Sequence, residues 1–300
     1  MNERSLTRFA WLSIFAAVVT ISLKAIAYFL TGSVGLLSDA LESGVNLAAA
    51  IMALLMLKVS EKPPDKEHLY GHTKAEYFSS IVEGVLIIIA ALSIIVTSVD
   101  RLLHPKLIEQ AFAGLAVSIA ASLINFGVAV TLLKAGKKNK SVILQADGHH
   151  LLTDVWTSVG VIVGVGLVFL TNVQLLDPII ALLVATNIIV TGFTIMKQSA
   201  LGLMDTSLPD EDLLKIREIL SKYQKKGMSY HGLKSRQSAT RSFMSVHILV
   251  PGNWTVQKGH NLLEEIELAI GKNFPKMTVF THLEPIEDPK SREDISIDRQ

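Results

Sequence analysis

The 300-residue sequence contains no cysteine and few charged residues. The absence of cysteine excludes disulfide bonds, thiolate catalysis and cysteine-based zinc sites, so any metal site must use nitrogen and oxygen ligands. Only 18% of the residues are charged, against about 25% in an average soluble domain, and the mean hydropathy is +0.43. These values exclude an ordinary soluble globule. The 28 basic and 27 acidic residues leave a net charge of +1, so nothing in the overall charge favours nucleic acid as a partner.

Six apolar stretches are each long enough to cross a bilayer as a helix, which takes about 20 residues. They cover residues 9–30, 34–57, 75–99, 112–133, 142–171 and 178–196. Lysine and arginine accumulate in cytoplasmic loops, and here they precede the first stretch and follow the second and fourth. These residues are Arg4, Arg8, Lys58, Lys62, Lys66, Lys74, Lys134, Lys137, Lys138 and Lys140. The sequence therefore predicts a polytopic α-helical membrane protein with six transmembrane helices and both termini in the cytoplasm.

After residue 204 the composition changes to that of a soluble domain. The pattern predicts a helix near residues 209–223, strands near 230–237 and 242–250, a helix near 256–273 and a strand near 278–283. This order indicates a small two-layer α+β domain. We expect a transmembrane transport domain over residues 1–204, a cytoplasmic domain over 205–287 and a disordered charged tail over 288–300.

Two pairs of residues that can bind metal lie inside predicted membrane helices. Glu42 and Asn46 are four residues apart in the second stretch, and His150 and Asp154 are four apart in the fifth, so each pair shares one helix face. All four lie about 12 to 20 Å along their helices, at about 1.5 Å per residue. Two antiparallel helices would bring them together near the bilayer midplane. Ionisable groups are costly there unless partnered, which favours a cation site over a purely structural hydrogen-bond network.

Further histidines and carboxylates lie outside the membrane helices. The loop after the second stretch carries Asp65, His68 and His72 at spacings of three and four, which can converge on one cation. Solvated loop histidines are the alternative there. In the soluble domain the candidate ligands are His231, His247, His260, His282 and Glu284. Four histidines in so small a domain suggest metal binding rather than ordinary surface histidines.

Several motifs together resemble the cation diffusion facilitator family of divalent-metal/proton antiporters. They are Thr31-Gly32-Ser33-Val34 leading into Ser38-Asp39-Ala40-Leu41-Glu42-Ser43-Gly44-Val45-Asn46, then Pro64-Asp65 through Gly71-His72-Thr73-Lys74-Ala75-Glu76, His150 through Asp154, and Asp205 followed by Leu208-Pro209-Asp210-Glu211. The resemblance covers nearly the whole chain. It implies a homodimer with six spans per protomer and a cytoplasmic ferredoxin-like domain that binds metal at the dimer interface.

The resemblance also assigns roles position by position. It implies a transport site at Glu42, Asn46, His150 and Asp154, and a second site at Asp65, His68 and His72. It implies regulatory sites at His231, His247, His260, His282 and Glu284. It further implies that Lys74 and Asp205 form a charge pair that braces the membrane part against the soluble domain.

One position departs from the family pattern. Zinc-transporting members usually carry Asp or His followed four residues later by Asp in the second span, whereas this chain has Glu42 and Asn46. An amide oxygen is a neutral, harder and weaker ligand than a carboxylate. This departure opens manganese, iron(II), cobalt, nickel and cadmium as substrates beside zinc, which stays the first expectation.

The expected function is proton-coupled efflux of divalent metal ions across the inner or plasma membrane by alternating access in a lipid-embedded homodimer. Metal ions would be both substrate and regulator, and His150 would exchange a proton with the metal, because ligation needs neutral imidazole. We expect no enzyme activity. A membrane-embedded metalloenzyme is one alternative, but the sequence lacks an H-E-x-x-H motif. A metal sensor that transports nothing is another, and the paired intramembrane ligands argue against it.

Overall fold

A computed structural model describes residues 6–31, 34–104, 111–171, 173, 175–224 and 227–292. The chain divides into two compact units, Met1–Ala200 and Leu201–Gln300, which are described separately. The first unit is helical and the second contains a small sheet. This is the fold class that the sequence predicts.

The helices of the first unit follow the predicted apolar stretches. They are α1 (Thr7–Thr31), α2 (Val34–Ser60), α3 (Ala75–Leu103), α4 (Ala111–Asn139), α5 (Val142–Thr171) and α6 (Leu176–Leu203). Within the described residues, four segments are long and apolar enough to cross a membrane. They are Thr7–Ile26, Ala75–Leu103, Ile119–Asn139 and Pro178–Leu203. The count of six spans stays a prediction.

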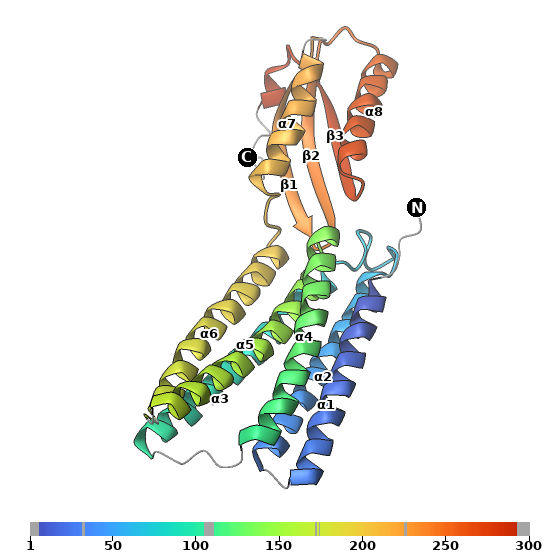
Figure 1. Cartoon of the computed structure of the whole chain (residues 1–300). Helices are drawn as coiled ribbons and strands as arrows, with labels where there is room; N and C mark the ends of the chain where they lie inside the picture. Colours follow the sequence, from blue (N-terminus) through green and yellow to red (C-terminus); the bar gives the residue numbers. More distant parts are fainter. Residues whose placement is uncertain are drawn as a thin grey trace. The chain divides into compact units, whose positions relative to one another are not determined.

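Helices α1, α2, α4 and α5 pack against one another in the first unit (Figure 1). Their shared core contains Ala16, Leu57, Leu132 and Leu144, one from each helix. Alanines are frequent in this core, and small side chains allow membrane helices to approach closely. The packing places α5 against both α4 and α2, which matters for the site described below.

Helices α3 and α6 cross at a pair of glycines. A Cβ atom added to Gly84 would lie 3.0 Å from the carbonyl oxygen of Gly192, and one added to Gly192 would lie 3.0 Å from that of Gly84. Ile87 of α3 and Ile188 of α6 join Ala146 of α5 in a second buried cluster. Both glycines are therefore required by close backbone contact rather than by turn geometry.

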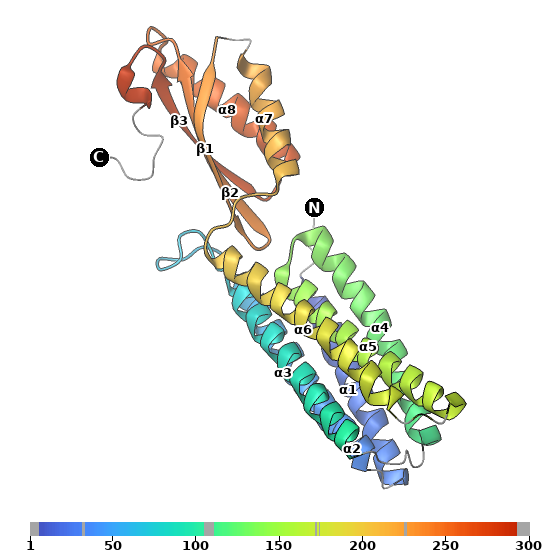
Figure 2. The same cartoon turned by 90° about the vertical axis from the view of Figure 1, so that its left-hand side faces the viewer.

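The second unit has the element order that the sequence predicts. Its elements are α7 (Asp210–Gln224), β1 (Ser229–Ser238), β2 (Arg241–Val250), α8 (Val256–Asn273) and β3 (Met277–Pro285). The sheet order is β1-β2-β3, with β1 antiparallel and β3 parallel to β2. Figure 2 shows α7 and α8 on the same side of this sheet.

Side chains alternate between the two faces of the sheet along each strand, and the helices cover only one of these faces. Met244, Val246 and Ile248 of β2 are buried in one core with Ile216 of α7 and Ile266 of α8. Because successive strand residues face opposite sides, the odd-numbered residues of β2 lie on the face away from the helices. That open face carries the histidines described below.

The predicted tail is only partly described. Residues Pro289–Arg292 form a short 3-10 helix, in which the Ser291 hydroxyl donates to the carbonyl oxygen of Pro285 at 2.9 Å. The remainder of the predicted tail, residues 293–300, lies outside the described residues.

Candidate metal sites

The intramembrane candidates on α5 are inside the helical unit. His150 is 4% exposed, and Asp154, one turn further along, is half-buried. Helix α5 packs against α2, which carries Glu42 and Asn46. The side chains of Glu42 and Asn46 lie outside the described part of the chain. The predicted convergence of the four groups therefore stays a prediction.

The start of α5 is held by a carboxylate from another helix. Glu76, in the first turn of α3, is fully buried, and its Oε2 accepts hydrogen bonds from the Ser141 hydroxyl at 2.5 Å and from the Ile143 amide at 3.4 Å. The Ser141 hydroxyl oxygen in turn accepts from the Leu144 amide at 3.5 Å. At a helix N-terminus, a carboxylate accepts hydrogen bonds from amides that have no partner within the helix, and the helix dipole stabilises its negative charge. Glu76 thus fixes α5 about two turns before His150.

Two more buried carboxyl groups lie on the helices around this region. Asp147, three residues before His150, is 2% exposed, and its Oδ1 accepts a hydrogen bond from the Ser13 hydroxyl of α1 at 3.1 Å. Glu83 of α3 is 1% exposed and accepts from the Ser79 hydroxyl at 3.5 Å. Sequence reasoning did not assign either residue to a site. The spacing of three between Asp147 and His150 was the available signal.

A third polar residue contacts a predicted ligand directly. The Nδ2 of Asn125 on α4 lies 3.4 Å from the Oδ2 of Asp154 and donates a hydrogen bond to it. Asn125 is 7% exposed. Sequence reasoning missed this residue, because it lies in an uncharged apolar stretch and has no ligand partner at helical spacing.

The loop between α2 and α3 brings Asp65, His68 and His72 together, and we call these three residues the loop cluster. One ligand atom from each lies within 4.8 Å of the others. The two Asp65 oxygens are each 3.3 Å from a histidine nitrogen, Nδ1 of His68 and Nε2 of His72. The two imidazole rings are 4.4 Å apart between centroids. This arrangement offers one carboxylate and two imidazoles to a divalent ion.

A local turn builds the loop cluster. The Oδ1 of Asp65 accepts hydrogen bonds from the backbone amides of His68 at 2.7 Å and Glu67 at 3.0 Å. Gly71 supports the turn with a left-handed φ of +84°. The hydrogen bond from the His68 amide, above all, lowers the pKa of the Asp65 carboxyl below 3.8, and His72 adds to this effect. The carboxylate is therefore ionised and available as a ligand.

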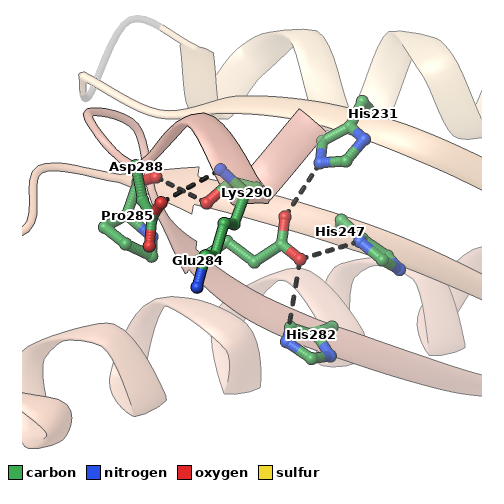
Figure 3. Close-up of polar contacts among 8 residues, drawn as sticks. His231, His247, His282, Glu284, Pro285, Asp288 and Lys290 are labelled. Carbon is green, nitrogen blue, oxygen red and sulfur yellow. Dashed lines mark hydrogen bonds and ion pairs between the residues drawn. The ribbon is translucent and has the colours of Figure 1, made fainter. Parts of the chain in front are cut away.

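The open face of the sheet carries a second group, which we call the sheet cluster: His231, His247, His282 and Glu284. His231 of β1 pairs with His247 of β2, and His247 pairs with His282 of β3, so the three histidines form one row across the sheet. Figure 3 shows the three imidazoles turned toward the Glu284 carboxylate. Its oxygens lie 2.9 Å from Nε2 of His231, 3.1 Å from Nδ1 of His247 and 3.7 Å from Nε2 of His282.

Burial and an irregularity in the first strand shape the sheet cluster. The Glu284 side chain is 7% exposed, those of His231 and His247 are 17% and 20% exposed, and that of His282 is 62% exposed. The strand register shifts between His231 and Lys234, where Gly232 has a φ of +61°. A Cβ atom at Gly232 would come 3.4 Å from the His247 ring. The glycine thus lets His231 and His247 lie close together.

Two assignments that the resemblance implies lie outside these clusters: His260 as a metal ligand, and the charge pair between Lys74 and Asp205. His260 lies on α8, which packs on the other face of the sheet, and its exposed imidazole is 4.0 Å from Glu264 one turn away. Asp205 pairs with Arg236 at 3.2 Å within the second unit, while Lys74 occupies the N-cap position of α3 in the first unit without a side-chain hydrogen bond to the helix amides. The role of His260 and the charge pair between Lys74 and Asp205 stay predictions.

Comparison with known proteins covers both units. Residues 10–204 match the family model of the cation efflux transmembrane domain, and residues 208–286 match that of the cation efflux protein cytoplasmic domain. The transporter sll1263 of Synechocystis sp. is 50% identical over 97% of this chain and 94% of its own. The cation-efflux pump FieF of Cronobacter sakazakii is 27% identical over 94% of this chain and 93% of its own. A solved structure of CzrB in its zinc form is 33% identical, covering 28% of this chain and 96% of that chain, with a TM-score of 0.27.

Proposed function

The chain belongs to the cation diffusion facilitator family of cation efflux proteins, and on this premise we propose that it exports divalent transition-metal ions in exchange for protons. Membership makes it a multi-pass membrane transporter of divalent cations rather than an enzyme. The proton exchange, the choice of metal, the dimer and the orientation in the membrane belong to the proposal.

The observation that carries the proposal is the placement of His150 and Asp154 inside the helical unit. His150 is almost fully buried and Asp154 is hydrogen-bonded by a second helix, so neither is an ordinary surface residue. Ionisable groups at membrane depth are costly and generally line ion pathways. A buried imidazole and carboxylate on one helix face suit a divalent cation that has lost most of its water.

The four proposed transport ligands supply a balanced charge. Glu42 and Asp154 contribute two negative charges, and Asn46 and neutral His150 contribute none, so the sum matches a divalent ion. A proton that binds His150 removes its ligand lone pair and adds a positive charge, which weakens metal binding. Alternate exposure of the site to the two sides, through movement of helices against one another, would then couple metal exit to proton entry.

Zinc is the first proposed substrate, and manganese, iron(II), cobalt, nickel and cadmium are open. Asn46 stands where zinc-transporting members of the family usually carry Asp, and its neutral amide oxygen is a weaker ligand than a carboxylate, which supports a substrate range beyond zinc. Measurement of flux across this set of metals decides between them.

We propose a regulatory role for the sheet cluster. In a homodimer with cytoplasmic termini, His231, His247 and Glu284 would bind cytosolic metal, and His260 would join them only from a second copy of the chain. Metal that binds the dimer better than the monomer stabilises the dimer. The loop cluster would bind a further cytosolic ion.

Flux into proteoliposomes tests the transport proposal. Asp154→Ala should reduce zinc uptake driven by a pH gradient at least tenfold, because it removes an anionic ligand from a buried site. Asp100→Ala is the matched control, since Asp100 is exposed near the end of α3 and pairs with His104. Wild-type flux in a folded Asp154→Ala protein would contradict the site, and zinc binding without uptake by the wild-type chain would favour a sensor.

A further inference from the structure

Asn125 connects helix α4 to one of the proposed transport ligands, Asp154 of α5. Its amide nitrogen donates to the Oδ2 of Asp154 at 3.4 Å. Helices α4 and α5 pack as sequence neighbours joined by a short turn, so this contact links two well-packed elements (Figure 2). The contact places Asn125 next to the proposed transport site. Any role of Asn125 in that site rests on the function proposed above.

The hydrogen bond to the Asp154 carboxylate determines which atom of the Asn125 amide faces it. An ionised carboxylate only accepts hydrogen bonds, so the amide must present its NH2 group to Asp154. Its carbonyl oxygen is then directed away from the carboxylate oxygen that the NH2 group binds. That oxygen, Oδ1, is buried and accepts no hydrogen bond from any side chain or backbone group in the described part of the chain.

A buried amide oxygen without a hydrogen bond is unfavourable. Such a group costs about 1 to 3 kcal/mol in a protein interior, and the hydrocarbon environment of a membrane offers no water to satisfy it. Asn125 is 7% exposed, so bulk solvent does not relieve this cost. A cation bound by Asp154 would lie within reach of the same amide and would satisfy its oxygen.

We propose that Asn125 supplies its amide oxygen as an additional ligand to the metal ion held by Asp154, so that the transport site includes helix α4 as well as α2 and α5. The ligand set would then contain two amide oxygens, from Asn46 and Asn125, two carboxylates and one imidazole. Zinc generally binds four ligands in a tetrahedral arrangement, whereas manganese prefers more numerous oxygen ligands. Asn125 is therefore a residue that raises the preference for manganese relative to zinc.

The experiment measures initial uptake of Mn2+ and of Zn2+ by the full chain in proteoliposomes. Asn125→Leu removes both the oxygen and the NH2 group at similar volume. Asn125→Asp removes the NH2 group but keeps an oxygen ligand. Asn139→Leu is the control, because Asn139 lies on the same helix and its side chain donates only to the carbonyl of Ala135 in its own helix.

We expect Asn125→Leu to lower the ratio of kcat/KM for Mn2+ to that for Zn2+ by about tenfold, the usual effect of changing a group around a metal site. Asn125→Asp should keep that ratio at or above the wild-type value, and Asn139→Leu should leave it unchanged. An equal fall of the ratio in both Asn125 variants would overturn the proposal, because it would mean that the residue only holds Asp154. An unchanged ratio in Asn125→Leu would also overturn it.

Two further measurements keep this result separate from the transport proposal. Thermal melting of each solubilised variant identifies a loss caused by unfolding, and Asn125→Ala, which also removes the amide oxygen, carries the comparison if Asn125→Leu does not fold. Mn2+ binding, followed by electron paramagnetic resonance of the solubilised chain, reports on Asn125 even if the wild-type protein transports neither ion. Equal Mn2+ affinity in the wild-type and Asn125→Leu proteins would sink the ligand role, whereas absent flux alone would sink only the transport proposal.

Discussion

The loop cluster and the sheet cluster use the same kinds of ligands but are assembled in different ways. The loop cluster lies within one turn of eight residues, from Asp65 to His72, and its geometry follows from hydrogen bonds inside that turn. The sheet cluster joins residues from three strands, and its central carboxylate is 7% exposed. One site therefore depends on local backbone geometry and the other on the folded core of the second unit.

The two environments also differ in how strongly charges act. Asp65 and His68 have side chains that are 53% exposed, so water screens their attraction. Glu284 lies beneath three imidazoles with little solvent around it, where a charge interacts more strongly with its neighbours. We expect the sheet cluster to be the more sensitive of the two to loss of its carboxylate and to loss of the fold.

The largest expected effect comes from weakening the core beneath the sheet cluster. Ile248→Ala removes a fully buried side chain next to His247 and should destabilise the second unit by about 2 to 5 kcal/mol. Zinc binding at the sheet cluster should weaken with unfolding, while binding at the loop cluster should persist. Thermal melting and zinc titration of the solubilised full chain check both outcomes.

Leu214→Ala is the control for this change, because Leu214 lies on α7 but is 60% exposed. It should leave melting and zinc binding close to the wild type. If the sheet cluster kept its affinity in a chain whose second unit had unfolded, the contrast between a local and a tertiary site would be wrong.

An intermediate effect is expected from Glu284→Gln. The substitution keeps the shape of the side chain but removes the charge that faces His231, His247 and His282, so zinc affinity at the sheet cluster should fall by about 10 to 100-fold. Equilibrium dialysis of the full chain with zinc measures this change. Glu264→Gln, at an exposed position beside His260, should have no comparable effect. Equal losses in both variants would show that Glu284 has no special role.

The smallest effect is expected from Asp65→Asn. The exposed carboxylate contributes less to binding, so zinc affinity at the loop cluster should fall by about tenfold or less. Competition with a fluorescent zinc indicator measures the change, and Glu67→Gln is the neighbouring control, because Glu67 contributes only its backbone amide to the turn. A larger loss here than in Glu284→Gln would reverse the proposed ranking of the two clusters.

The pH dependence of the loop cluster sharpens the same comparison. The pKa of Asp65 is lowered in the folded turn, so its stabilising contribution is fully present above its ordinary value of 3.8 and is lost as the pH falls through the lowered pKa. Zinc release between about pH 7.5 and pH 5 should therefore follow protonation of imidazole rather than of Asp65. Zinc titrations across this range should give the same slope of log affinity against pH for the wild type and for Asp65→Asn, although the affinity of the variant is lower throughout.

Much of the fold was predictable because its signals are local. The fifth apolar stretch was predicted at residues 142–171 and α5 covers Val142–Thr171, since a long apolar run has few alternatives to a membrane helix. The strands of the second unit were placed within two residues of their observed ends, because β-branched and aromatic residues alternate there between turn residues. The loop cluster was likewise visible as a spacing of three and four.

The remaining features required contacts between distant residues. Sequence reasoning grouped the four histidines of the second unit, but His260 lies on α8, which packs against the face of the sheet opposite to the other three. Asn125 was not predicted, because nothing in the local sequence of the uncharged helix α4 indicates which of its residues contacts Asp154 on α5.

The sequence by itself determined the membrane class, the element order and the residues able to bind metal, because hydropathy, periodicity and side-chain chemistry are properties of short segments. Outside the loop cluster, only the tertiary structure decided which of these residues meet. Strand pairing aligned His231, His247 and His282 over one buried carboxylate, and helix packing brought Asn125 of α4 to Asp154 of α5. These contacts depend on the register of the strands and the rotation of the helices. The packing of buried side chains sets both, and no short segment of the sequence determines either of them.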